Sequence, residues 1–284
     1  MSGLPKISVV TPSFNQAEFL QRNLDSVAAQ CGTDFEHLVL DGGSTDGTKA
    51  VLEQNTDKLS YWRSEPDQGQ TMALIDGFAR AGGDVLCWLN SDDYFWAPNV
   101  LAKVARAFAA HPEADIVTAD TVLVGADETP LMIDMVARPS ARQMRYAMAM
   151  PQQSTFWRKS AYEAVGGLDP AFRYCMDFDL FQRLSQGRKI VRLPMVAAAF
   201  RIHPASKTST WHAVFREEMD RLQSRYGSGP LHWLAVKAVT LEIRLGSVAA
   251  EVSAIAAGRT LPTYMNTRLE PVRWHVRRKH DLTG

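Results

Sequence analysis

The sequence predicts an α/β fold built on a doubly wound, Rossmann-like mixed sheet. Apolar, β-branched runs alternate with amphipathic segments over the first hundred residues, which is typical of strand–helix–strand units. Each predicted strand there ends in polar residues, and right-handed crossovers bring such ends to one edge of a sheet. With 284 residues, 46% of them hydrophobic, the chain can bury a full core. We therefore expect a ligand crevice at that edge.

The first part of the chain supplies four predicted strands and three helices. The strands are expected at 7–11, 36–41, 59–64 and 85–89, and the helices around 19–28, 48–54 and 71–81. Pro12 is predicted to end the first strand, because proline cannot donate to the ladder.

The second part is less regular. We expect a helix over 98–110, a strand over 115–120 that continues through 122–124, an irregular stretch over 125–150, a strand over 151–157, a helix over 159–165, a helix beginning near 177, and edge strands over 190–193 and 196–200. Apolar residues spaced 4-3-4-3 from Leu234 to Ile255 predict a long amphipathic helix, followed by a basic tail that contains Trp274.

Asp92 and Asp93 follow the apolar run 85–89 directly. One interpretation is a hard divalent ion, Mg²⁺ or Mn²⁺, shared with a substrate diphosphate. The other is N-capping of the helix over 98–110, and the pair taken alone favours it. Four polar strand ends on one rim are hard to explain as independent caps, so the rim as a whole favours the metal and nucleotide interpretation.

The loop over 41–48 places Asp41 at the end of the second predicted strand, where it can accept hydrogen bonds from a nucleobase or ribose. Its glycines let the backbone approach a ligand, and capping of the next helix is the alternative role of its polar residues. The spacing excludes an EF-hand, and the chain has neither a Walker A loop nor a GxGxxG turn at these strand ends.

Charge is unevenly distributed although the formal net charge is zero. Residues 1–100 hold 6 Lys and Arg against 14 Asp and Glu, leaving 25 against 17 in residues 101–284. This division suits a cation-dependent site beside an anion-seeking surface, and nucleic acid is not expected as a partner. Three widely spaced cysteines and the lack of a signal-peptide core or transmembrane run predict a cytoplasmic protein.

Four motifs in combination resemble family 2 glycosyltransferases of the GT-A fold. They are Ile7–Asn15, Asp41–Thr48, Asp67–Gly69 and Leu89–Asp93, within a resemblance that covers residues 5–210. The resemblance implies a divalent metal bound by Asp93 with His203. It also implies a set of residues that bind the nucleotide sugar: Thr11, Pro12, Phe14, Asn15, Asp41, Gly43, Ser44, Asp67, Gln68, Gly69, Gln70, Asn90, Ser91, Asp92 and Arg201.

The same resemblance implies that Asp177 is the base that deprotonates the acceptor hydroxyl, with helix capping as its alternative role. Met176 replaces an acid of the family pattern, so the role of that acid is in doubt, and Asp179 is expected to support the helix. The acceptor is expected to meet Gln152, Gln153, Trp157 and Met176.

The expected function is inverting, metal-dependent transfer of a sugar from a nucleotide sugar to a hydroxyl of a glycan or lipid-linked acceptor, as in cell-envelope polysaccharide biosynthesis. The alternatives are nucleotidyl transfer to a sugar phosphate and a non-catalytic nucleotide- or glycan-binding relative. We expect a nucleotide-sugar-binding half (1–95), an acceptor and catalytic half (96–215) and a helical, basic extension (216–284). The extension suits binding to an anionic membrane surface. Packing of its helix on its own domain, or on a second subunit in a homodimer, is about as well supported.

Overall fold

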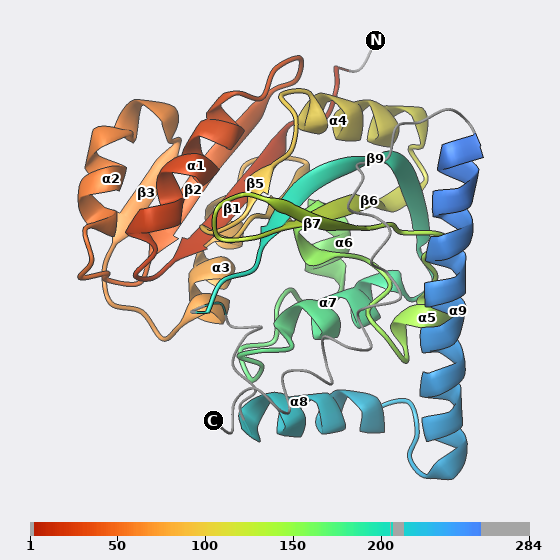
Figure 1. Ribbon diagram of the computed structural model, residues 1–284. Helices are drawn as coiled ribbons and strands as arrows, with labels where there is room; N and C mark the ends of the chain where they lie inside the picture. Colours follow the sequence, from red (N-terminus) through yellow and green to blue (C-terminus); the bar gives the residue numbers. More distant parts are fainter. Residues whose placement is uncertain (1–2, 205, 207–212, 257–284) are drawn as a thin grey trace.

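A computed structural model describes residues 3–204, 206 and 213–256 (Figure 1). Within them, one nine-stranded mixed sheet has the order β3-β2-β1-β4-β8-β6-β9-β5, and β7 pairs with β6. The strands are β1 (Ile7–Ser13), β2 (Phe35–Asp41), β3 (Tyr61–Ser64), β4 (Val85–Trp88), β5 (Tyr94–Phe95), β6 (Ala114–Val124), β7 (Pro130–Asp134), β8 (Thr155–Arg158) and β9 (Lys189–Arg201). The predicted mixed α/β sheet is confirmed.

Helices cover both faces of this sheet. They are α1 (Ala17–Ala28), α2 (Thr48–Gln54), α3 (Gln70–Arg80), α4 (Val100–Ala110), α5 (Ala141–Met144), α6 (Lys159–Ala164), α7 (Met176–Ser185), α8 (Ala213–Ser224) and α9 (Pro230–Ala256), with short 3-10 turns η1 (Thr56–Lys58) and η2 (Gln152–Ser154). Helices α3, α6 and α7 pack on one face, where Val10 points, and α1 and α4 pack on the other, where Val9 points. The period-two alternation of the strands produces this division.

The first strand runs two residues further than predicted. Strand β1 is parallel to β2 through Ser13, which is opposite Asp41, whereas its pairing with β4 ends where Val10 meets Trp88. Pro12 therefore lies beyond the end of β4, and its missing N–H does not interrupt a ladder on that side.

The second part of the chain also departs from the prediction. The stretch 125–150, predicted to be irregular, contains β7, which is antiparallel to β6, and the short helix α5. The two predicted edge strands form one strand, β9, which is parallel to β6 with irregularities in register near Asp120. The predicted strand over 151–157 begins as η2, and only Thr155–Arg158 forms a strand.

Helix α9 runs along one side of the molecule after α8 (Figure 1). Val239 is buried, and Ser247 Oγ donates to Met135 O at 2.6 Å. The apolar stripe that predicted this helix faces outward, with Leu241 and Leu245 56% and 61% exposed. The predicted basic tail lies outside the described residues. No helix of the described ranges is long and apolar enough to cross a membrane.

Candidate functional site at the carboxyl edge of the parallel strands

Parallel register brings the predicted strand ends together. Ser13 is opposite Asp41, Asp41 is opposite Ser64, and β4 lies on the other side of β1. The loops that follow these strands therefore share one edge of the sheet, as the sequence predicted. Phe14 is 61% exposed on this rim.

Asp41 is buried and held by serines. Ser44 donates both its backbone N–H, at 3.0 Å, and its hydroxyl to the Asp41 carboxylate, and Ser64 Oγ donates at 2.6 Å. Ser64 was not predicted as a site residue, although its place at the end of β3 was a signal for it. The carboxylate therefore has a fixed orientation at the end of β2.

The loops on either side of Asp41 are tied to their neighbours. Asn15, at a positive φ of 52°, accepts from Thr45 N at 2.9 Å through its side chain, and its own N–H donates to Ser44 Oγ at 2.7 Å. A Cβ on Gly43 would lie 2.9 Å from Pro66 N, at a φ of +81°. In the structure, Gly43 thus allows close approach of the loop around Pro66 and Asp67, whereas the sequence predicted approach of a ligand.

The loop before α3 is folded by Asp67, which accepts from Gly69 N at 2.7 Å, with Gln68 exposed beside it. The next residue, Gln70, donates from Nε2 to Asn90 Oδ1 at 2.9 Å. Asn90 in turn donates to Gln152 Oε1 at 3.3 Å. The structure thus joins the predicted donor residues Gln70 and Asn90 to Gln152, which was predicted to meet the acceptor.

Asp93 is completely buried in the turn after β4, and Ser91 of the same turn is also buried. It accepts from Arg201 N at 3.0 Å and from Asn90 Nδ2 at 3.3 Å. Burial, followed by repulsion from Asp92, raises the pKa of Asp93 well above its usual range. A cation beside these carboxylates would offset that cost, so the pair fits a divalent ion.

His203 lies against Asp92, with His203 Nε2 3.0 Å from Asp92 Oδ2, and it packs on the ring of Phe19. No group of three or more His, Cys, Asp and Glu side chains within the described ranges could hold a metal by itself. Mg²⁺ is commonly held by one or two carboxylates together with substrate phosphates, and Asp93 supplies such a carboxylate in the same turn as Asp92, the partner of His203. A hollow of about 300 Å³ beside His203 is lined also by Asn15 and Asp46.

Arg201 is buried, and its guanidinium binds the protein itself. It donates to Asp92 O at 3.0 Å, to Ala126 O at 2.7 Å and to Glu128 at 3.0 Å. These contacts fix the turn that carries the aspartates, whereas the sequence predicted a contact with the nucleotide sugar.

Asn23 is a residue of the candidate site that sequence reasoning missed. This buried side chain of α1 donates to Asn90 O at 2.9 Å and to Asp93 O at 3.0 Å. Thr11 Oγ1 lies 3.5 Å from Asn23 Oδ1 and 2.9 Å from the buried His37 Nε2. An amide on the buried side of an amphipathic helix was the available signal, because a buried polar group needs partners.

Asp177 is the second residue of α7, and Cys175 occupies the N-cap. Asp177 Oδ1 accepts from Phe178 N at 2.7 Å, so Asp177 binds the first turn without being its N-cap. Asp179 is completely buried and pairs with Arg183 at 2.5 Å and with Arg225, which is the supporting role expected of it.

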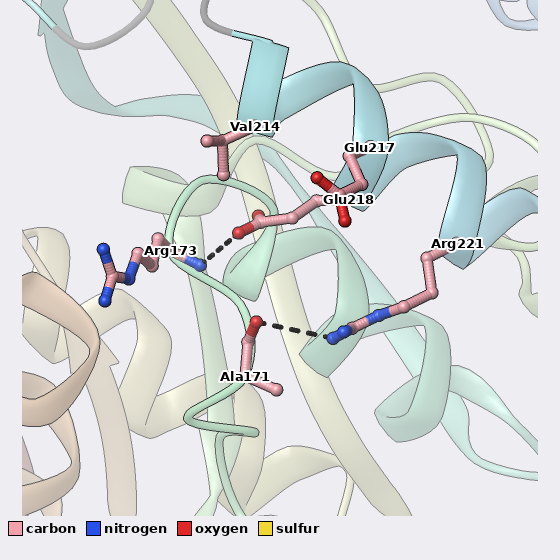
Figure 2. Close-up of a pocket in the computed structure, with 6 residues that line it drawn as sticks. All are labelled: Ala171, Arg173, Val214, Glu217, Glu218 and Arg221. Carbon is pink, nitrogen blue, oxygen red and sulfur yellow. Dashed lines mark hydrogen bonds between the residues drawn. The ribbon is translucent and has the colours of Figure 1, made fainter.

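The other predicted acceptor residues are largely buried. Trp157 lies in the same core cluster as Met176, the first residue of α7, and Gln153 is 8% exposed. A second hollow of about 200 Å³ lies before α7 and is lined by Ala171, Arg173, Val214, Glu217, Glu218 and Arg221 (Figure 2). It lies between the loop before α7 and α8, and its α8 residues were not predicted as site residues.

Known proteins resemble this chain in sequence and in fold. An uncharacterized glycosyltransferase of Mycobacterium tuberculosis is 32% identical over 237 residues, which are 81% of this chain and 88% of that protein. A mannosyltransferase, PcManGT from Pyrobaculum calidifontis, was solved with GDP-Man and Mn²⁺. Its structure matches with a TM-score of 0.62 at 19% identity, and the match covers 91% of this chain and 77% of the mannosyltransferase chain. A TarS fragment of S. aureus with UDP-GlcNAc has a TM-score of 0.62 at 15% identity, and the match covers 85% of this chain and 81% of the fragment.

This chain spans 39% of another, longer TarS structure. The solved structures show that the fold is the mixed α/β fold of GT-A glycosyltransferases. The model of glycosyl transferase family 2 matches residues 8–163. This match includes the loops over 11–15, 41–48, 67–70 and 89–93, which we call the donor rim, and leaves out Arg201 and His203. The chain therefore belongs to glycosyl transferase family 2.

Proposed function

We propose that this glycosyltransferase moves a sugar from a nucleoside-diphosphate sugar to a hydroxyl of a glycan or lipid-linked acceptor, with inversion and with the help of Mg²⁺ or Mn²⁺. The observation that carries the proposal is the buried Asp93 beside Asp92, at an edge where Asp41 and Asn90 also converge. Two adjacent carboxylates held in this way need a cation or a proton.

Asp41 would hold the nucleobase or ribose, and the loops over 11–15 and 67–70 would enclose it. Asp93 and His203 would hold the divalent ion, with Asp92 in contact with His203. A bound ion would supply charge stabilisation for the departing nucleoside diphosphate. Asp177 would take the proton from the acceptor hydroxyl as its oxygen attacks the anomeric carbon from the side opposite the diphosphate.

The alternatives have less support. Nucleotidyl transfer usually requires a basic, Gly-rich loop after the first strand, and that position holds Pro12, Ser13 and Phe14. A non-catalytic relative would be expected to lack Asp93 or Asp177, and both are present.

The exposed face of α9 supports a peripheral role at the cytoplasmic surface of a membrane, where a lipid-linked acceptor would reside. Leu234, Leu241, Leu245 and Val248 are all exposed on one helix. Immersing this face in an anionic membrane would bury it, and homodimer formation through the same face is the competing proposal.

Thermal unfolding in the presence of nucleotide sugars, with and without Mn²⁺, tests donor and metal together. We expect one donor class to raise the melting temperature in a Mn²⁺-dependent way, because a ligand of the native state stabilises it by mass action. Asp93→Asn should lose this dependence and keep its melting temperature without ligand, because a neutral amide relieves a buried charge. Asp84→Asn, an exposed acid at the opposite end of β4, is the control. Unchanged, metal-dependent donor affinity in Asp93→Asn would exclude Asp93 as the ligand.

A further inference from the structure

The loop that leads into α7 is held by a residue far along the chain. Residues 171–175 precede the helix, and the N-cap, Cys175, makes no side-chain capping hydrogen bond. The N–H of a helix N-cap needs an acceptor, and so do those of the loop before it. For Arg173, Tyr174 and the N-cap Cys175, the acceptor comes from α8.

Glu218 supplies that acceptor with one carboxylate. Its Oε1 accepts from Arg173 N at 2.7 Å, and its Oε2 accepts from Tyr174 N and Cys175 N, each at 2.9 Å. Figure 2 shows the Glu218 side chain reaching from α8 to this loop. Glu218 is 6% exposed, so these charge-assisted bonds are sheltered from water. Three successive N–H groups around one anion form a rigid nest.

The same loop is tied to the donor side. Thr71 Oγ1, in the first turn of α3, donates to Phe172 O at 2.7 Å, and the preceding residue, Gln70, donates to Asn90. On the other side, Arg221 of α8 stacks on the ring of Phe172, 4.1 Å from its centroid. The loop is therefore clamped between the donor rim and α8.

Asp177 lies two residues beyond the last N–H that Glu218 holds. Burial and the charges of Asp177 and Glu218 together raise the pKa of the Cys175 thiol to about 12, so both carboxylates act on the same short segment. Small displacements of a reacting group are costly, because a shift of about 1 Å can slow a reaction about 100-fold.

We propose that Glu218 is a positioning residue for the transfer reaction: it fixes the loop 173–175 and thereby places the Asp177 carboxylate against the acceptor hydroxyl. This inference rests on the proposed role of Asp177 as the base. Glu218 itself touches neither donor nor acceptor in this proposal. It acts only through the start of α7.

The test is a double-mutant cycle in the full chain, with Glu218→Gln and Asp177→Asn made singly and together. We expect Glu218→Gln to lower kcat about 10- to 100-fold, with donor KM and donor-induced thermal stabilisation nearly unchanged. In the Asp177→Asn background, Glu218→Gln should cause little further loss, because there is no base left to position. Glu217→Gln removes the same charge from the neighbouring, exposed residue and should stay within about twofold of the parent enzyme.

The outcomes separate the two proposals. Equal fold losses in both backgrounds, or normal turnover in Glu218→Gln while Asp177→Asn is inactive, would overturn the positioning role alone. Near-normal turnover in Asp177→Asn would remove the base, and this inference with it. If Glu218→Gln does not fold, Glu218→Asp keeps the charge with a shorter reach. A kcat loss in Glu218→Asp that vanishes in the Asp177→Asn background supports the proposal, and an equal loss in both overturns it.

Discussion

The donor rim and the start of α7 hold their candidate site residues in different ways. Asp41 is fixed by Ser44, three residues away, and by Ser64 on the next strand of the sheet. The start of α7 is fixed by Glu218, more than forty residues later in the chain. The family match over residues 8–163 contains the donor rim, whereas Asp177 and Glu218 both lie beyond it. The arrangement around Asp41 thus follows from sheet register, whereas the arrangement at the start of α7 depends on long-range contacts.

The largest expected effect is a loss of turnover when Asp177 of α7 is replaced, and the same change at Asp179 of that helix should act on stability instead. Asp177→Asn should lower turnover roughly 10²- to 10⁴-fold, the usual contribution of positioned proton transfer, and leave donor affinity and the melting curve nearly unchanged. Steady-state kinetics and thermal unfolding measure both. Near-normal turnover would move the search for a base to the partly exposed Asp169, because Asp179 is completely buried and paired with Arg183.

Asp179→Asn is the matched substitution two residues away, and its expected result is the reverse. Asp179 is buried, and it pairs with Arg183 and Arg225, which are 25% and 33% exposed. Removing its charge takes away the carboxylate that both cations share, although Arg225 still lies 3.9 Å from Asp169. The free energy of unfolding should fall by roughly 1–3 kcal/mol. A large loss of turnover in Asp179→Asn with a normal melting curve would show that Asp179 serves the reaction and not the stability of α7.

The next effect is a pH dependence of stability that comes from the buried His37 in β2. Burial lowers the pKa of His37 to about 3, from about 6.5 in an unfolded chain. Between these values the unfolded chain binds one more proton at this site, so stability is complete above about pH 6.5 and falls as pH decreases. The slope should approach about 1.4 kcal/mol per pH unit.

Urea unfolding of the parent protein and His37→Gln at pH 7, 6, 5 and 4 isolates this slope. Burial raises the pKa of Asp120 to about 6, which gives a slope of opposite sign between about pH 4 and 6. Asp120 is present in both proteins, so its contribution cancels in the difference. Parallel stability curves for the two proteins would show that His37 is not the source.

The smallest expected effect on stability concerns α9. Val239 and Ser247 on its inner face are buried, and Leu241 and Leu245 on its outer face are exposed. Leu241→Gln with Leu245→Gln should change unfolding free energy by less than about 1 kcal/mol. Flotation with anionic vesicles should fall about tenfold, because the apolar area that enters the membrane is smaller. These variants keep the contact of Ser247 with Met135, which truncation near Ser228 would remove. Unchanged flotation together with a lower oligomeric mass would show that a second copy covers this face.

Local pattern was enough to predict the strands of the donor half, the carboxylates at their ends and the helix that became α9. Parallel strands place their carboxyl ends on one edge, so Asp41, Asn90 and Asp93 could be brought together without coordinates. The continuation of β1 past Pro12 could not be predicted from the sequence, because it depends on where β4 ends.

Tertiary structure decided which groups hold these residues. Arg201 faces backbone carbonyls and Glu128, and Glu218 reaches a loop about forty residues earlier. The spacing of α9 showed an apolar stripe, and packing turned that stripe toward solvent because the opposite face, with Val239, is also apolar enough to be buried. Periodicity records which residues share a face of a helix or strand, whereas the partner of that face is determined by contacts between segments far apart in the sequence.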